Sequence, residues 1–447
     1  MYVMKNKQHW YAALVALLLC GVSSLCVPSA RADTEPDTIN LRVSQFLSKE
    51  QINGPNYTVN DRVVNQGFTN IYRVTSPFGE FDVIGDPQVA VRAQEINAIA
   101  KLREMSKVGV VAKSAGEAAT TTVKTVGRVV NDPGGTLSGI PSGVGRLFKR
   151  TVRKTQDVYE KAKEAADDES QEKSNVDDGT DEKANDDADK NEAVDEGKKL
   201  AKRYLGVNSS VRKLARDLQV DPYTDNQVLR VELESMAKYA AAGSFGTKLI
   251  MPGFGSAVGH LADVGDLVYK TDPLDLRLRN EKALRDMGVS EDLVETFFEN
   301  KHHTLTTLTR VIVSLEQLNG VNSRPVLVDY ASQVQSPAEA RFYARLGELF
   351  VALHRGRGKL VEIVATERIP FAVTEDGRAL LATPVDYLRW TNAVAEAAEY
   401  IDKASGKRAS KTEVWLEGSL SPVAHKKLGA FRWQVFDRAF DRLDNKR

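Results

Sequence analysis

The chain has 447 residues, of which 42% are hydrophobic and 27% charged, and its 61 basic residues equal its 61 acidic ones in number. This is the composition of a globular protein, and the length allows about two or three domains. The two cysteines, Cys20 and Cys26, both lie in an N-terminal apolar run. Beyond that run the chain excludes thiol nucleophiles, zinc–thiolate sites and iron–sulfur clusters, because cysteine supplies the reactive or ligating group in each.

Residues 1–32 predict a secretory signal peptide. Lys5 and Lys7 precede an apolar run, Tyr11 to Cys26, which is short for a membrane span. Ala30 and Ala32 place small residues at the two positions that a signal peptidase reads, so we predict cleavage after Ala32. An uncleaved membrane anchor is the alternative. The mature chain would then be periplasmic or secreted, and its own core would hold it without disulfides.

The region 33–164 is predicted to combine a small β-hairpin with helices. Tyr72 and Val74 alternate with polar neighbours before the sequence Ser-Pro-Phe-Gly at 76–79, which indicates a hairpin turn. Asp86 is followed by proline, and this pair predicts the N-cap and first residue of a helix. Hairpin and helix together would form a minimal core.

Basic amphipathic helices are predicted between Lys107 and Lys154. The first has an apolar stripe of alanine and valine only, with basic residues on its other sides. Shallow faces of this kind are typical of helices that lie on lipid surfaces, although packing against a neighbouring helix is the alternative. The residues expected to contact an anionic surface are Lys107, Lys113, Lys124, Arg128, Arg146, Lys149, Arg150, Arg153 and Lys154.

The region 165–197 is predicted to be a disordered acidic linker. It has 14 acidic residues and 3 lysines, a net charge of −11, and no aromatic residue, leucine, isoleucine or methionine. Asp187 to Lys198 partly matches a calcium-binding EF-hand loop. However, Glu192 stands where the loop needs glycine, and Lys198 stands where it needs a bidentate glutamate. We therefore interpret this stretch as solvated linker.

The region 198–356 is predicted to be a helical domain. Leu305, Leu308, Ile312 and Leu315 repeat at helical spacing. The sequence Ser-Pro-Ala-Glu at 336–339 predicts a capping box at the start of another helix. Short connections favour antiparallel neighbours.

Two stretches of this domain resemble ligand sites in part. Glycines at 253, 255 and 259 faintly match a nucleotide-binding loop, but they are better explained as a helix-packing segment. The second stretch contains half of a di-iron carboxylate motif without the second copy that such bundles need. The candidate metal ligands in this stretch are Glu295, Glu299, His302 and His303.

The region 357–447 is predicted to be a small α/β domain. A hairpin is expected to turn at Asp376 and Gly377, and a helix to run from Thr383 to about Asp402. A strand at 412–418 and a helix that starts at Ser421 should follow. The alternation of strand and helix favours a layered α/β arrangement.

These patterns predict a mostly helical α+β protein: an N-terminal hairpin with helices, a C-terminal helical bundle and a small α/β layer. We expect an exported cell-envelope protein that acts by binding, without enzymatic activity. Its expected partners are an anionic lipid or envelope surface or another protein, and it should use neither a cofactor nor nucleic acid. The alternative is a hydrolase that uses carboxylate or histidine residues of the C-terminal half.

Overall fold

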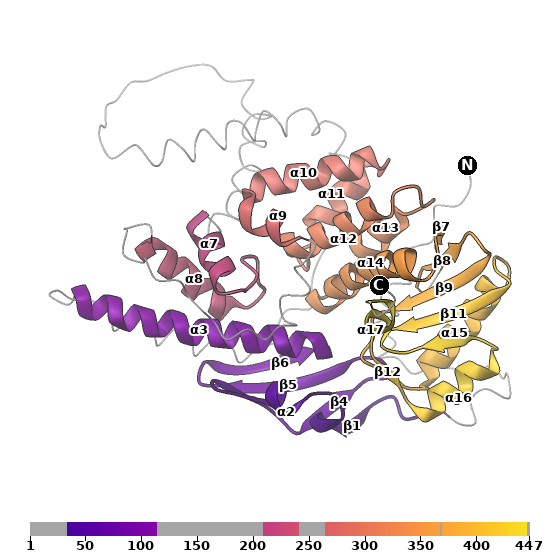
Figure 1. Ribbon diagram of the computed structural model, residues 1–447, viewed down its shortest axis with the longest axis horizontal. Coiled ribbons are helices and arrows are strands. Elements are labelled where there is room, and N and C mark those ends of the chain that lie inside the picture. The colour runs from indigo at the N-terminus through magenta and orange to yellow at the C-terminus, as the bar shows by residue number, and fades with distance from the viewer. Residues whose placement is uncertain (1–33, 114–208, 241–263, 367–368, 445–447) are drawn as a thin grey trace, which may run out of the picture.

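The computed structural model describes residues 34–113, 209–240, 264–366 and 369–444, which form a mixed α+β protein (Figure 1). Several predicted features lie outside these residues. They are the signal peptide, the basic residues from Lys124 to Lys154, the acidic linker with its EF-hand-like stretch, and the glycines at 253, 255 and 259.

The N-terminal part is built on a six-stranded antiparallel sheet, the N-terminal sheet. The predicted hairpin is confirmed, since Tyr72 pairs with Val83 and Val74 with Phe81. The expectation of a hairpin alone was wrong, because four further strands of two to four residues complete the sheet. The elements are β1 (Ile39–Arg42), η2 (Val43–Gln45), α2 (Lys49–Ile52), β2 (Asn53–Gly54), β3 (Tyr57–Val59), β4 (Arg62–Asn65), β5 (Asn70–Ser76) and β6 (Gly79–Ile84).

Helix α3 (Asp86–Lys113) connects this sheet to the helical part. Ile96 packs against the sheet, whereas Ile99 and Leu102 belong to the core of the helical part, and all three are fully buried. The predicted start of this helix is confirmed, but Asp86 is not its N-cap. The Asp86 carboxylate accepts hydrogen bonds from Tyr72 and Asn70 of β5 instead.

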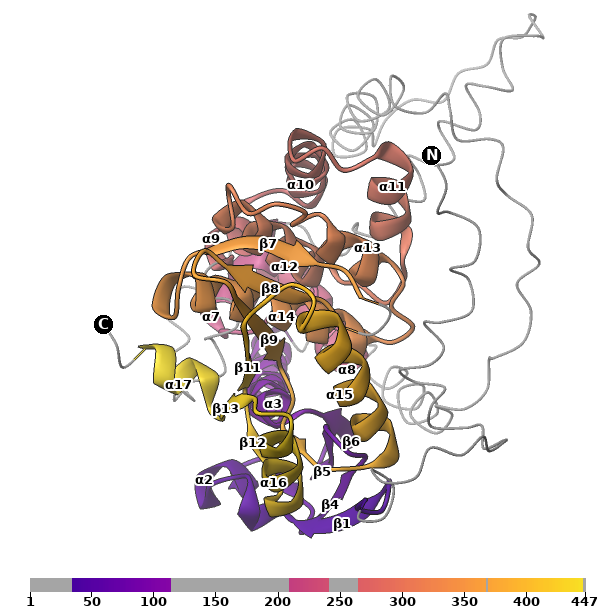
Figure 2. The ribbon, with the colours of Figure 1, turned by 90° about the vertical axis from the view of Figure 1, so that its right-hand side faces the viewer.

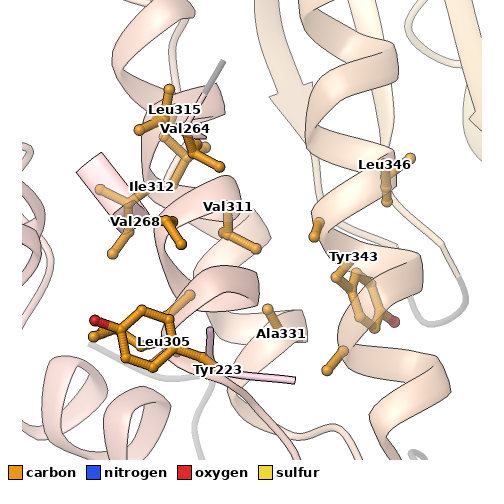
Figure 3. Close-up of a cluster of buried hydrophobic side chains, with 14 of the residues drawn as sticks. Tyr223, Val264, Val268, Leu305, Val311, Ile312, Leu315, Ala331, Tyr343 and Leu346 are labelled. Carbon is orange, nitrogen blue, oxygen red and sulfur yellow. The ribbon is translucent and has the colours of Figure 1, made fainter. Parts of the chain in front are cut away.

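The helical part surrounds α12 (Figure 3). The predicted stripe is confirmed, since Leu305, Leu308, Ile312 and Leu315 are at most 1% exposed. The helices are α7 (Ser209–Asp217), α8 (Gln227–Ala240), α9 (Gly265–Lys270), α10 (Pro273–Asp286), α11 (Glu291–Glu299), α12 (Leu305–Gln317), α13 (Val326–Ser332) and α14 (Pro337–Gly356).

Helices α12 and α14 run parallel, so the expectation that they are antiparallel was wrong. Arg310 of α12 donates to Glu348 of α14. Seven residues further along both helices, Arg355 of α14 donates to Gln317 of α12. Figure 3 shows the same direction. Helix α13 lies between them in sequence and carries the chain back to the starting end. Because α13 was not predicted from the sequence, the predicted relative orientation of α12 and α14 was wrong.

The predicted capping box of α14 is half formed. The Ser336 hydroxyl accepts from the Glu339 amide, as expected. The Glu339 carboxylate accepts from the amide of Gln335 rather than from that of Ser336.

The C-terminal part contains a five-stranded sheet, the C-terminal sheet, in the order β13-β11-β9-β8-β7. The chain runs β7–β8–β9 as an antiparallel meander, and two helical crossovers then add β11 and β13 parallel to β9. The five strands are β7 (Leu360–Val364), β8 (Phe371–Thr374), β9 (Arg378–Thr383), β11 (Lys411–Leu416) and β13 (Gln434–Phe436). Strands β10 (Tyr387–Leu388) and β12 (Ser419–Leu420) form a separate two-stranded sheet.

Helices cover both faces of this sheet. Leu381 and Val414 pack with α15 (Asn392–Ser405) and α16 (Pro422–Ala430), whereas Leu380 and Trp415 pack with α14 and α17 (Ala439–Asp444). Figure 2 shows the strands between α15 and α17. The core on the α14 side is continuous with that of the helical part.

Most local predictions for this part are confirmed. The hairpin turns through Gly377, whose φ of +78° suits glycine, and Ser421 caps α16. The helix expected from Thr383 was wrong, because α15 begins at Asn392 with Thr391 as its N-cap. The intervening residues instead form β10, which pairs with β12, and contact the N-terminal part.

Across the described ranges, no helix combines the length and apolar character needed to cross a membrane.

Replacing Ile99 with alanine should lower the free energy of unfolding by about 2–5 kcal/mol, because the side chain is fully buried where α3 joins the helical core. The control is Val231→Ala on α8, where valine is 48% exposed and the change should stay within about 0.5 kcal/mol. Urea unfolding followed by circular dichroism measures both. Equal losses in the two variants would contradict the proposed position of α3 in the core.

Candidate functional site

The carboxyl ends of strands β9 and β11 meet the start of α3. Parallel strands bring their carboxyl ends to one edge of a sheet, which is where α/β proteins commonly bind ligands. Asp386 follows β9 and Glu417 follows β11, and Asp86 reaches the same place from the N-terminal part. We call Asp86, Asp386 and Glu417 the carboxylate junction.

Asp386 connects the two sheets with both of its carboxylate oxygens. Oδ2 accepts from the backbone amide of Asn70 at 3.0 Å, and Oδ1 accepts from the amide of Asp86 at 2.8 Å. The second bond satisfies an amide at the N-terminus of α3, where a negative charge also suits the helix dipole. Asp386 therefore fixes both β5 and α3 to the C-terminal part.

Asp86 uses only one of its oxygens in this network. Its Oδ1 accepts from the Tyr72 hydroxyl at 2.5 Å and from Asn70 Nδ2 at 2.8 Å. Burial and then the charge of Asp86 raise the pKa of Tyr72, so the phenol stays protonated and donates.

Glu417 belongs to a chain of ion pairs. Arg345 donates to Glu417 Oε1 from Nε at 2.8 Å and also contacts Glu348, which Arg310 binds with two bonds of 2.6 and 3.0 Å. Burial opposes ionisation of Glu348, but Arg310 and Arg345 outweigh it and lower its pKa. This chain links α12 and α14 to the end of β11.

It is unfavourable for the carboxyl groups of Asp86 and Asp386 to be ionised at the same time. Burial raises the pKa of each; the charge of Glu417 adds to the effect on Asp86, and the charge of Asp86 adds to that on Asp386. Such a pair can hold one proton between its members, which is the property that acid–base catalysis requires. However, donors from the protein itself already occupy Asp86 Oδ1 and both oxygens of Asp386.

Arg389 makes a second connection beside the carboxylate junction. Its guanidinium is fully buried and donates to Asn65 Oδ1 at 2.7 Å, to the Pro36 carbonyl at 2.6 Å and to the Asp37 carbonyl at 3.0 Å. The acid pair therefore lies within a polar contact between two parts of the chain.

The candidate metal ligands do not form a site. Helix α11 ends at Glu299, so Glu299 and His302 do not share a helix face as the sequence suggested. Both nitrogens of the buried His303 are engaged: Nε2 lies 2.7 Å from the Ala331 carbonyl and Nδ1 lies 3.2 Å from Thr307 Oγ1. Within the part of the chain that the structure describes, no three acidic, histidine or cysteine residues are grouped to hold a metal ion.

Lys107 and Lys113 are the two predicted surface-binding residues within the described ranges. Both belong to the C-terminal part of α3, which remains helical through Lys113.

A buried polar cluster between α3 and α8 was also missed in the sequence. The Glu95 carboxylate accepts from Thr224 and, at 3.0 Å, from Asn226, and Arg92 pairs with it at 2.8 Å. Nearby, burial raises the pKa of Asp221 to about 6. These residues hold α3 against the segment that leads into α8.

Comparisons of the full chain with protein families, with curated proteins and with solved structures find no match.

Replacing Gly418 with alanine should disrupt the carboxylate junction, because its Cβ would lie 1.9 Å from the Asp386 carbonyl oxygen. We expect the free energy of unfolding to fall by about 1–3 kcal/mol or more. The control is Gly429→Ala in α16, where a Cβ meets nothing within 4 Å and alanine should stabilise the helix by up to about 1 kcal/mol. Thermal and urea unfolding compare the two variants, and similar effects would argue against this close approach.

Proposed function

We propose that this protein is exported to the periplasm or secreted and acts by binding, associating peripherally with anionic surfaces through the basic region that begins on α3. In this proposal, the regions 198–356 and 357–447 are a helical domain and a small α/β domain that share a continuous core on the α14 side. The acidic stretch 165–197 is a flexible tether between the basic region and these domains.

One observation carries the proposal: α3 is firmly held at its start and remains helical into the basic region. Asp386 accepts from its first amide, and Ile96, Ile99 and Leu102 are fully buried along its length. The helix then continues through Lys107 and Lys113. A helix held in this way would present the start of the basic region in a defined direction from the body of the protein.

The energetics suit reversible association. Each lysine or arginine near an anionic membrane surface contributes about 1 kcal/mol, so several acting together suffice to localise a protein. Screening limits the attraction to about 10 Å at 0.1 M salt, and binding should therefore weaken as salt increases. The net charge of −11 in the tether would compete with the surface for the basic residues.

Changing Arg146, Lys149 and Arg150 to glutamine should reduce co-sedimentation of the mature chain with anionic vesicles at low salt, because three attractive charges are lost. The matched control is Lys403→Gln, Lys407→Gln and Lys426→Gln, which removes equal charge from exposed positions in and around α15 and α16. The control should bind as the wild-type chain does. Deleting 165–197 should strengthen binding, and neutral vesicles should bind none of these chains.

Two results would overturn the proposal. The first is no preference for anionic over neutral vesicles in the wild-type and deletion chains. The second is an equal loss of binding in the two triple variants, which would indicate an effect of net charge alone.

A hydrolase is the second candidate, and the acid pair Asp86–Asp386 is the observation that favours it. Burial raises the pKa of both groups, as in sites that keep one carboxyl protonated for acid catalysis. If this function holds, chromogenic glycosides, esters or phosphates should be hydrolysed with an optimum at mildly acid pH. Asp86→Asn should abolish that activity, whereas Asp376→Asn on the exposed β8–β9 turn should not. Unchanged hydrolysis by Asp86→Asn would exclude the acid pair as its source.

A further inference from the structure

The segment 385–390 closes the contact between the N-terminal and C-terminal sheets. The amide of Asp386 donates to the Phe68 carbonyl at 3.0 Å, and the amide of Arg389 donates to the Gly67 carbonyl at 2.6 Å. The side chains of both residues add further bonds to the N-terminal part. Because this contact includes buried hydrogen bonds to ionisable side chains, its stability depends on their protonation.

The two carboxylates in this contact differ in their capacity to carry a proton. Asp386 accepts a backbone N–H group with each of its oxygens, and a protonated oxygen is a weaker acceptor, so protonating Asp386 would weaken one of these two bonds. Both bonds to Asp86 are made through Oδ1. Among the described residues no hydrogen-bond donor contacts Asp86 Oδ2, which leaves this oxygen as the place for a proton.

We propose that closing the carboxylate junction takes up one proton on Asp86 Oδ2, so that the contact between the two sheets tightens in acid surroundings and loosens as the pH rises. This inference does not depend on membrane binding. It adds a proton-linked conformational change to a protein that, if exported, would experience the pH outside the cytoplasm.

The charged groups around the pair support this assignment. Tyr72 from β5 stays neutral and donates to Asp86. Burial and then the charge of Asp86 raise the pKa of Asp386 well above its usual range, but in the proposed state Asp386 keeps its charge because it accepts two backbone amides. Glu417 adds a second negative charge, which Arg345 from α14 partly balances. One proton on Asp86 relieves the repulsion without removing a hydrogen bond.

The direction of the pH effect follows from linkage. The ordinary pKa of an aspartate is 3.8, and closing the junction raises that of Asp86. The stabilisation from the bound proton is therefore fully present below the ordinary value. It is lost progressively as the pH rises through the raised value, after which no further loss occurs.

Hydrogen exchange at the amides of Asn70 and Asp86 tests the proposal, because both donate to Asp386. After correction for intrinsic exchange rates, their protection in the full mature chain should fall by up to about tenfold per pH unit above pH 4, and then level off. Asp86→Asn keeps both Oδ1 bonds and cannot ionise, so its protection should not vary with pH.

The matched control is Asp376→Asn. Hydrogen bonds from Arg378 and Thr374 lower the pKa of this exposed aspartate to about 2, so it remains ionised throughout the measured range. This variant should keep the wild-type profile. A flat wild-type profile would overturn the proposal, and so would a sloping profile in Asp86→Asn, which would assign the proton to another group.

Glu417→Gln decides the question if Asp86→Asn does not fold. The contacts from Arg345 to Glu417 reach Oε1, which glutamine retains. Loss of the Glu417 charge should lower the raised pKa of Asp86, so that protection levels off at a lower pH than in the wild-type chain. An unchanged profile in this variant would contradict the proposed environment of Asp86.

Discussion

The two hydrogen bonds that Asp386 accepts from the backbone amides of Asn70 and Asp86 are the constraint on which the arrangement of the two sheets depends. They join positions 316 and 300 residues apart, and they hold the strand and the helix of the N-terminal part at once. Arg389 reinforces them from the same segment by binding Asn65. A buried contact of this polar kind is specific in geometry, because each donor must meet its acceptor, but it gains less from burial than an apolar one.

Helix α3 connects this contact to the rest of the protein. Its early turns contribute Ile96 to the core of the N-terminal sheet, and its next turns contribute Ile99 and Leu102 to the helical core. Arg92 and Glu95 add a polar contact to the segment that leads into α8. One helix therefore takes part in two cores, and its position relates the sheet to the helices.

Local signals allowed much of the secondary structure to be predicted. The stripe on α12, the turn at Gly377 and the cap at Ser421 each depend on residues within a few positions of one another. The arrangement of elements could not be predicted in the same way. No sequence spacing reveals the contact between Asp86 and Asp386, because only the fold brings them together. The proline after Thr383 predicts a helix, but residues 385–390 instead form the segment that binds the N-terminal part.

The N-terminal segment at Glu35 has a consequence for the order in which the chain can fold. The amide of Trp390 donates to the Glu35 carboxylate across 355 positions, and the Ser421 hydroxyl donates to the same oxygen across 386. Contacts between such distant positions require closure of very long loops, which slows their formation. They also require that the C-terminal sheet exist as a binding surface. In a chain that emerges N-terminus first, the earliest of the described residues to appear would therefore be among the last to reach their final position.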